Sequence, residues 1–305
     1  MKLSLFDAHC DTVSEIYKTR CGFTNNNLHI SLNKAKMFQR YFQVFALYIP
    51  SILSINEAYT HAKNLYSVYK EEVCRYMPQI GNSLSFKIMD RGSILSIENA
   101  HCFINDEDSV SEFYEMGVRI ISLTHNEDNR YACGCKTKND IGLTQLGKRL
   151  IKQLLKRGII IDVSHLSFKS FWDIIDNIDK GLMATHSCSY TIKNHERNLT
   201  DDMFREIKMR NGFVGLNIYP EFIGGDRCGI DNIINHIEHF LNLGGENTIG
   251  LGCDFDGVDK LPEGITGIND ISKLADRMLQ KNFSDKTVRD IFYNNGVNFI
   301  RNHIN

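Results

Sequence analysis

Residues 158–165 read GIIIDVSH. Three consecutive isoleucines, followed by a valine two positions later, favour a β-strand because branched side chains pack well on a pleated sheet. The run is apolar on both faces, which is typical of a strand covered on both sides, as in a parallel sheet. It ends in the polar residue His165, at a position where packing alone does not require one.

The same pattern recurs along the chain, so eight strands are expected. The eight runs lie at residues 2–9, 41–49, 93–98, 118–125, 158–165, 181–186, 212–219 and 247–255. Helical patterns lie between most of them, at residues 56–77, 144–158, 167–178, 200–210 and 230–244. Eight strands, each continued by a helix or a long connection, predict an α/β chain with a parallel sheet closed into a (β/α)8 TIM barrel.

One domain is expected over residues 1–305, because no linker rich in Pro, Gly or Ser and no block of like charge divides the chain. Residues 14–40 are rich in Asn and Lys and lack a clean helical period, so we expect an elaborated loop over the barrel mouth. Helical patterns at about 270–305 are expected to close the barrel.

The composition argues against several classes of partner. With 42% hydrophobic residues, 24% charged residues and a formal net charge of −2, the chain has no overall field that would attract nucleic acid or an anionic membrane. We therefore expect small molecules, or copies of the same chain, as partners. Few residues precede FDAHCDT (6–12), and no apolar run reaches 18 residues, so we expect no secretory signal and no membrane span.

The nine cysteines are odd in number and form no CxxC pair, which predicts reduced thiols and a cytoplasmic location. Cys133 and Cys135 form a CxC in a polar segment. Two thiols cannot complete a tetrahedral zinc site, and no second Cys or His pair lies nearby in the sequence, so a metal role for them is not expected.

Six of the eight expected strands end in a residue that can bind a metal or move a proton. These residues are His9 with Asp11, Glu98, His125, His165, His186 and Asp254. The carboxyl ends of barrel strands converge on one face, where active sites lie. Each residue alone is explained as a satisfied polar group, but several carboxylates and imidazoles around one desolvated mouth cost free energy unless a cation compensates them.

Nitrogen and oxygen ligands of this kind suit zinc or a similar first-row ion, and the strand ends carry no cysteine that would indicate a closed structural zinc site. His9, Asp11, Glu98, His165 and His186 are more ligands than one tetrahedral site with an open position can use. We therefore expect two ions that share Glu98 as a bridge. His9 and Asp11, at i and i+2 of one expected strand, would face the same side and chelate one ion together.

Six motifs, in chain order, resemble those of the membrane (renal) dipeptidase family, zinc dipeptidases built on a metal-dependent (β/α)8 barrel. The motifs are DAHCDT, SIENAH, GVRIISLTHN, GIIIDVSHLS, ATHSCSYTIKNHERNLTDD and GLGCDFDG. The resemblance runs from about residue 6 to the final helices. It implies two zinc ions, one held by His9 and Asp11, the other by His165 and His186, with Glu98 between them, and it also implies a homodimer.

The resemblance further implies hydrolysis of the peptide bond of dipeptides by a hydroxide that bridges the two metals. Asp254 would be the catalytic carboxylate that takes a proton and returns it to the leaving amine. His125 would contact the substrate and stabilise the oxyanion, and Arg197 would bind the terminal carboxylate. Tyr219, at the end of the seventh expected strand, is a further candidate to line the substrate pocket.

Two segments depart from the family pattern. Glu98-Asn99-Ala100 stands where the family has Glu-Gly-Gly, and the loop after His125 reads NEDNRYACG instead of the usual aromatic loop. Glu98, the expected bridging ligand, is retained, so the two departures concern the shape of the substrate pocket.

Two alternatives remain. The first is another metal-dependent barrel hydrolase, such as a phosphotriesterase or a deaminase; those commonly open with His-x-His and many use a modified Lys as the bridge, whereas this chain has His9-x-Asp11 and Glu98. The second is a barrel that binds a ligand or metal without turnover. His236 and His239, at i and i+3, could also chelate a metal, but they lie on an amphipathic helix of the outer ring, where a surface or packing role is expected.

Overall fold

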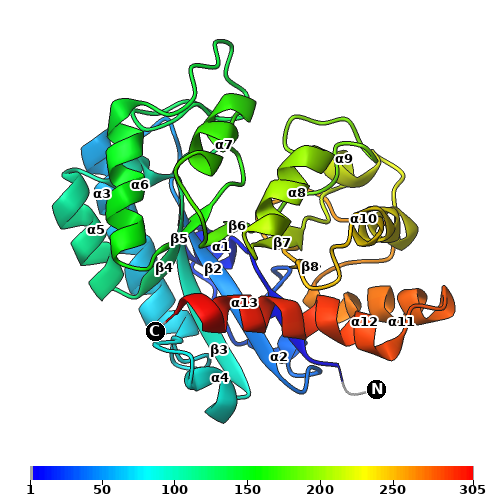
Figure 1. Ribbon diagram of the computed structural model, residues 1–305. Coiled ribbons are helices and arrows are strands. Elements are labelled where there is room, and N and C mark those ends of the chain that lie inside the picture. Colours follow the sequence, from blue (N-terminus) through cyan, green and yellow to red (C-terminus); the bar gives the residue numbers. More distant parts are fainter. Residues whose placement is uncertain (1–2, 305) are drawn as a thin grey trace.

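A computed structural model describes residues 3–304; the expected start of the first strand at residue 2 and the expected domain ends at residues 1 and 305 lie outside them. Eight parallel strands form a closed barrel in chain order, with the last strand paired to the first. The predicted TIM barrel is thereby confirmed (Figure 1). The strands are β1 (Leu5–Asp7), β2 (Tyr41–Tyr48), β3 (Arg91–Glu98), β4 (Val118–Ser122), β5 (Ile160–Asp162), β6 (Leu182–Ala184), β7 (Phe213–Leu216) and β8 (Ile249–Leu251).

Helices fill the connections on the outside of the barrel. They are α1 (Thr12–Thr19), α2 (Leu32–Ala35), α3 (Ile55–Val68), α4 (Ser85–Ile88), α5 (Asp106–Glu115), α6 (Gln145–Lys156), α7 (Phe168–Ile175), α8 (Asp201–Met209), α9 (Pro220–Ile223), α10 (Ile230–Asn242), α11 (Ser272–Gln280), α12 (Asp285–Arg289) and α13 (Asn295–His303). Short π-helical segments, η1 (Tyr69–Val73) and η4 (Asp290–Asn294), extend α3 and join α12 to α13. The 3-10 turns are η2 (Ala100–Cys102) and η3 (Ile268–Asp270).

Hydroxyl side chains begin several of these helices. Ser54, Thr144, Ser167 and Thr200 each accept a hydrogen bond from the backbone N–H three residues later. These bonds satisfy amide groups that have no partner inside the helix. The helices that the sequence predicts between residues 56 and 244 are all present, with ends shifted by a few residues.

Most strands end a few residues before the end of the apolar run that predicted them. His125, His165 and Asp254 each lie three residues beyond the end of their strand, in the connection that leads to the next helix. The expectation that His9 and Asp11 share one strand face is wrong. β1 ends at Asp7, and Asp11 is the N-cap of α1 with φ −103° and ψ 17°, because the chain must leave the sheet to enter that helix.

Several helices were not expected from the sequence, among them α1, α2 and α5. The segment 14–40 was predicted to lack helical structure, but α1 covers its first residues and α2 lies near its end. α1 has only two turns and buries Val13 and Ile16, too short a run for a clear 3.6-residue period. α5 was missed because its first turn is a run of acidic residues, which read as a polar connection.

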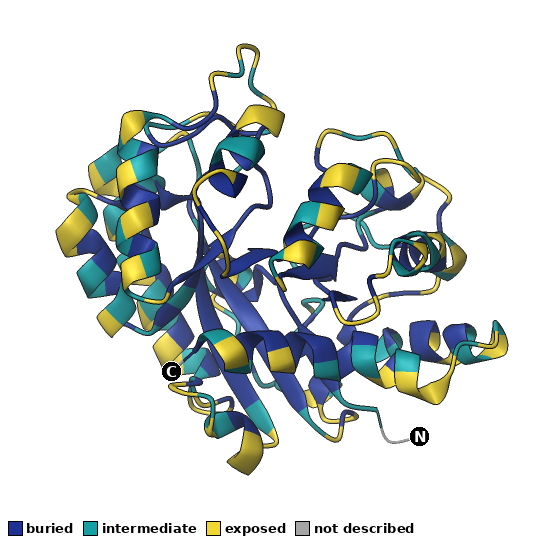
Figure 2. Cartoon of the chain, in the orientation of Figure 1, coloured by how far each residue is buried: buried dark blue, intermediate teal, exposed yellow. Residues whose placement is uncertain are grey.

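The amino end of the barrel is closed by apolar packing. Phe6, Phe42 and Phe213 fill the interior there, and α13 packs across it through Val297 and Ile300. Figure 1 shows α13 lying across this end, and Figure 2 shows the strands buried and the outer faces of the helices exposed. The polar residues at the carboxyl ends therefore open to the other side. Within residues 3–304, no helix combines the length and the apolar character needed to cross a lipid bilayer.

Candidate metal centre

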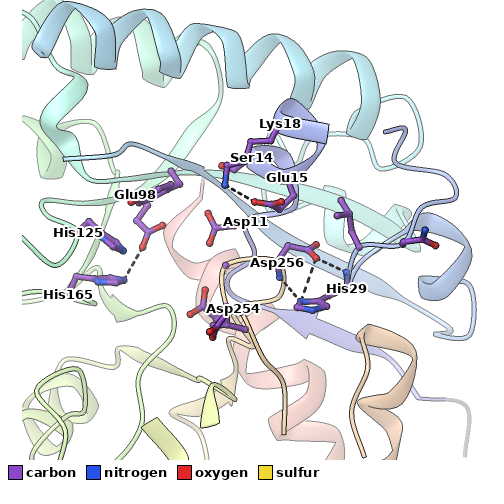
Figure 3. A pocket seen from close by; sticks show the side chains of 16 residues that line it. Asp11, Ser14, Glu15, Lys18, His29, Glu98, His125, His165, Asp254 and Asp256 are labelled. Atoms are coloured by element: carbon purple, nitrogen blue, oxygen red, sulfur yellow. Dashed lines mark hydrogen bonds and ion pairs between the residues drawn. The ribbon is translucent and has the colours of Figure 1, made fainter. Parts of the chain in front are cut away.

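The carboxyl mouth of the barrel brings the expected ligands together. One carboxylate oxygen of Glu98, Oε1, lies 2.9 Å from Nε2 of His165, and the other, Oε2, lies 3.6 Å from Nε2 of His9. Nε2 of His9 also lies 3.5 Å from Oδ2 of Asp11. Figure 3 shows Glu98, His125 and His165 on one side of a common space, with Asp11 and Asp254 facing them. Glu98 therefore lies between the two histidines that it is expected to link.

His186 and Asp254 complete the group. Nε2 of His186 lies 3.8 Å from Oε1 of Glu98, and Oδ1 of Asp254 lies 3.8 Å from Nε2 of His9. The ring centroids of His9 and His186 are 3.8 Å apart. Residues separated by up to 245 positions in the chain thus share one small volume.

Unusual backbone conformations place several of these side chains. His165 and Asp254 have φ values of 67° and 61°, and Asn99, directly after Glu98, has φ 79°. Positive φ is uncommon for residues other than glycine and costs about 1–3 kcal/mol. Each strain occurs where a strand ends and the chain turns its side chain into the mouth, which is the pattern expected of a functional site.

The partners of two histidines define which ring nitrogen carries the proton. Nδ1 of His165 lies 2.8 Å from the side-chain oxygen of Asn126, an acceptor, so Nδ1 is protonated. Nδ1 of His186 lies 2.8 Å from Oγ1 of Thr185, and this hydroxyl donates its own proton to Asp162 over 2.6 Å. Both rings therefore present an unprotonated Nε2, and these two atoms are 2.7 Å apart.

Two nitrogen lone pairs at this distance repel each other unless a cation lies beside them. Two further polar atoms of the site, Nε2 of His9 and Oδ1 of Asp11, are buried without a hydrogen-bond partner. An unpartnered buried polar group costs roughly 1–3 kcal/mol. Bound cations would remove both costs, so the residues present fit a metal site.

Burial dominates the protonation of the site. It raises the pKa of Glu98 to about 7 and raises the pKa of Asp254, although His9 opposes both shifts. Burial lowers the pKa values of His165 and His186 well below their usual range, which agrees with neutral rings. For His9, burial alone would lower the pKa, but Glu98 and Asp11 together raise it. A bound cation would favour the ionised carboxylates and the neutral imidazoles that ligands require.

Three overlapping sets of residues offer ligand atoms that lie within 4.8 Å of one another. The sets are His9 with Asp11 and Glu98, His9 with His186 and Asp254, and Glu98 with His125 and His165. Glu98 belongs to the first and the third set, as a bridge between two ions requires. His125 is close enough to serve as a ligand as well as a substrate contact.

A cavity of about 540 Å³ opens onto this centre, lined by Asp11, Glu98, His125 and His165 among others. Gly257 forms part of its wall. A Cβ atom at this position would lie 2.3 Å from Oδ2 of Asp11 and 2.6 Å from Oδ1 of Asp254. Only glycine allows the chain to approach the two carboxylates so closely.

Arg197 lies beside the backbone of His186 and is 5% exposed. Its Nη2 donates to the backbone carbonyl of His186 over 3.2 Å, and its Nε is buried without a partner. Among the described residues, no carboxylate forms an ion pair with its guanidinium. A buried cation without a counter-ion is costly, so this arginine is suited to receive an anion.

Tyr219, the last of the expected site residues, belongs to none of the three ligand sets. It is half-buried before α9, with its ring 5.0 Å from that of Phe222, and it lines neither the 540 Å³ cavity nor the cavity beside Arg197. Burial, together with a hydrogen bond to Asp259, raises its pKa. Asp259 does line the larger cavity, so the link of Tyr219 to the pocket is indirect and its substrate role stays a prediction.

Sequence reasoning missed the residues that hold the ligands in place. Asn126 and the Thr185–Asp162 pair orient His165 and His186, as described above. Asn217 donates to Oδ2 of Asp254 over 2.9 Å. Asn217 follows β7 directly, but the expected strand ran on to residue 219 and hid its position at a strand end.

The segment 14–40 contributes His29, which also escaped notice. Asp256 accepts hydrogen bonds from the backbone N–H of His29 and from the hydroxyl of Thr12, each over 2.6 Å. In return, Nδ1 of His29 accepts from the backbone N–H of Asp256 over 2.9 Å. These bonds hold His29 at the wall of the 540 Å³ cavity (Figure 3).

The His236/His239 pair and the Cys133/Cys135 pair, neither of which was expected to bind a metal, make ordinary contacts. His236 is fully buried and accepts from the backbone N–H of Ser189, whereas His239 pairs with Asp201 over 2.7 Å. Cys133 and Cys135 are free thiols and join none of the three ligand sets.

Comparison with known proteins places the chain in a family. The family model of Membrane dipeptidase (Peptidase family M19) matches residues 1–303. An uncharacterised dipeptidase of Schizosaccharomyces pombe, C965.12, is 35% identical over 189 residues, which cover 60% of this chain and 45% of that protein. A second one, C3A11.10c, is 30% identical over 204 residues, 65% of this chain and 50% of that protein. The chain thus spans about half the length of these curated relatives.

Solved structures share the fold along the whole chain. The crystal structure of the dipeptidase AC, a metallo peptidase of family M19, has a TM-score of 0.91 at 22% identity and covers 100% of this chain and 99% of its own. A metallo peptidase from Rhodobacter sphaeroides, bound to a phosphinate mimic of the dipeptide L-Ala-D-Ala, has a TM-score of 0.90 at 22% identity, with 99% of this chain and 100% of its own covered. With the family model matched over residues 1–303, the chain belongs to the membrane dipeptidase family, peptidase family M19.

Proposed function

We propose that this protein is a metallo-dipeptidase that hydrolyses the peptide bond of dipeptides at a binuclear zinc site. Membership of the dipeptidase family supports the reaction and the substrate class. The observation that carries the metal site is the convergence of the unprotonated Nε2 atoms of His165 and His186, 2.7 Å apart, beside the carboxylate of Glu98.

His9 and Asp11 would hold one ion and His165 and His186 the other, with Glu98 as the bridge. Nitrogen and oxygen ligands without thiolates suit zinc, and also cobalt or manganese. When bound, such ions would lower the pKa of a coordinated water and polarise the carbonyl of the substrate.

Asp254 is the base that fits the reaction. Its Oδ2 accepts a hydrogen bond from Asn217, which leaves Oδ1, the oxygen that faces His9, free to take a proton from water and return it to the leaving amine. Because burial raises its pKa, the carboxylate is a stronger base than an exposed aspartate.

His125 would stabilise the oxyanion as a neutral donor. Burial, aided by the charge of Arg197, lowers its pKa to about 4, so the ring is neutral at ordinary pH. A neutral imidazole still donates one N–H, and loss of one such donor typically costs about 100- to 1000-fold in rate.

Arg197 would bind the free carboxylate of the substrate. Its planar fork matches a carboxylate, and within the described part of the chain it has no acidic partner to compete. A carboxylate so close to the metal ligands belongs to the residue next to the cleaved bond, which accounts for a preference for dipeptides over longer peptides.

The test combines metal analysis with a dipeptide panel. Protein reconstituted with zinc should hold two ions per chain and hydrolyse dipeptides, and chelation should abolish activity that zinc then restores. Two bound ions without hydrolysis of any dipeptide, phosphotriester or aminopurine would favour a binding protein without turnover. Hydrolysis of only the phosphotriester or only the aminopurine would favour another metal-dependent barrel hydrolase. A cytoplasmic location and a homodimer stay predictions, open to fractionation and to light scattering.

A further inference from the structure

A second cavity, of about 270 Å³, lies beside the metal centre. His165 lines both this cavity and the 540 Å³ cavity, so both cavities reach this proposed metal ligand. Arg197 also lines the smaller cavity. The smaller cavity therefore has a metal ligand at one side and the unpaired guanidinium in the same wall.

The rest of this wall is mainly apolar and comes from both sides of the mouth. Phe171 lies in α7, and Leu166 comes just before that helix. Met203 lies in α8, and Leu199 comes just before that helix. All four side chains are at most 8% exposed. Figure 1 shows α7 and α8 facing each other across the mouth. At the rim, Phe168 is 59% exposed.

The two acidic residues that line the smaller cavity, Asp140 and Glu196, have contacts with neighbouring residues of the chain. Asp140 accepts from the hydroxyl of Ser167 over 2.6 Å and from the backbone N–H of Lys169 over 2.8 Å. Glu196 is exposed, and its Oε2 lies 3.8 Å from Nδ1 of His195. The larger cavity differs, because Asp11, Asp254 and Asp259 line it.

We propose that the smaller cavity receives the side chain of the C-terminal residue of the substrate and selects apolar residues there. This inference rests on the proposed function and adds the substrate class. In a dipeptide, one carbon atom bears both the terminal carboxylate and that side chain, so a carboxylate on Arg197 brings the side chain to this wall. The amino end then lies in the larger cavity, where Asp259, which has neither a metal-binding nor a catalytic role, offers a carboxylate to an ammonium group.

The proposal also gives a role to the segment that departs from the family pattern. Cys135 and Thr137, which follow the NEDNRYACG loop, line the smaller cavity. The specificity of this chain would therefore differ from that of relatives with another loop.

The first test is a substrate series for the zinc-loaded protein. Ala-Leu and Ala-Phe should exceed Ala-Gly and Ala-Asp in kcat/KM by about tenfold or more, because apolar surface enters the cavity only with the first two. Equal values across the series would overturn the inference and leave the dipeptidase activity standing. Hydrolysis of none of the four would overturn the proposed function, and the inference with it.

The second test uses two matched substitutions on α8. Met203→Gln replaces an apolar side chain of the wall with an amide of similar length, and Gln has about the same helix propensity as Met. Met209→Gln makes the same change at an exposed position of the same helix. The ratio of kcat/KM for Ala-Leu to that for Ala-Gly should fall several-fold with Met203→Gln and stay at the native value with Met209→Gln.

A ratio unchanged by Met203→Gln would count against the proposal. If that variant does not fold, as judged by its thermal transition, Phe168→Ala takes its place, because this rim residue is exposed and its loss opens the cavity without a buried defect. Phe168→Ala should lower the Ala-Phe to Ala-Gly ratio, and an unchanged ratio would again contradict the proposal.

Discussion

Arg197 donates a hydrogen bond from Nη2 to the backbone carbonyl of His186 over 3.2 Å. The residue expected to hold the substrate carboxylate is thus anchored to the main chain of a proposed metal ligand. The bond positions the guanidinium and leaves its charge unpaired, since a carbonyl carries no net charge. The proposed carboxylate site and the proposed metal site are therefore linked through two residues eleven positions apart.

Arg197→Ala should raise KM about 10- to 100-fold and change kcat little, because hydrogen bonds to a charged group contribute about 1.5–3 kcal/mol. Steady-state kinetics with a free dipeptide measures this effect. The corresponding dipeptide amide lacks the carboxylate and should show the same KM with both enzymes. An unchanged KM for the free dipeptide would remove the carboxylate role.

Glu98→Gln should reduce bound metal and activity together, with kcat/KM lower by at least about 100-fold. The amide retains the shape but loses the charge that lies 2.9 Å from His165 and 3.6 Å from His9. Elemental analysis alongside kinetics would test this. Glu71→Gln, at an exposed position on η1, is the control and should leave both quantities unchanged. Full metal content in Glu98→Gln would contradict its role as the bridge.

Asp254→Asn should separate chemistry from metal binding. We expect kcat to fall about 100- to 10,000-fold, the usual contribution of a general base, while zinc content and KM change little. The amide oxygen can still accept from Asn217, so the local structure should persist. Retention of most of kcat would assign the proton transfer to another group.

Asn126→Ala should weaken metal binding by about 10- to 100-fold, as is typical when the group that orients a ligating histidine is lost. The lost contact is the 2.8 Å bond to Nδ1 of His165. Zinc titration against a competing chelator measures the affinity. Asn177→Ala, at an exposed position after α7, should have native affinity. Native affinity in Asn126→Ala would show that the metal alone orients His165.

The burial of His236 predicts a pH dependence of the free energy of unfolding that does not involve the candidate metal centre. Burial lowers its pKa from 6.5 to about 4 in the folded protein. Below pH 6.5 the unfolded chain binds a proton that the folded chain does not, so stability falls as the pH drops from 6.5 to about 4. Over this range the native protein should lose roughly 3 kcal/mol more than His236→Asn.

Urea unfolding of both metal-free proteins at about pH 7 and about pH 4 would measure this difference. Since both proteins share every other titrating group, only the difference between them reports on His236. Equal losses would mean that this histidine is protonated in the folded state as easily as in the unfolded chain.

The sequence by itself determined the eight strands, their order and the residues at their carboxyl ends. Apolar runs such as IIIDV recur at intervals that admit one parallel barrel, and every such barrel gathers its strand ends at one mouth. His9, Asp11, Glu98, His165 and His186 could therefore be assigned to a common site without knowledge of any distance. α1 and α5 escaped because short or acidic helices lack a clear apolar period.

Only the tertiary structure decided how that mouth is built. Asn126 and Asn217 orient His165 and Asp254 from other connections, Asp162 holds Thr185 beside His186, and residues at α7 and α8 help to form the cavity beside Arg197. These contacts join segments tens of residues apart, and no local pattern encodes them. The physical reason is that hydrophobic periodicity specifies which face of an element is buried, whereas partners and cavity shape depend on how whole elements pack against one another.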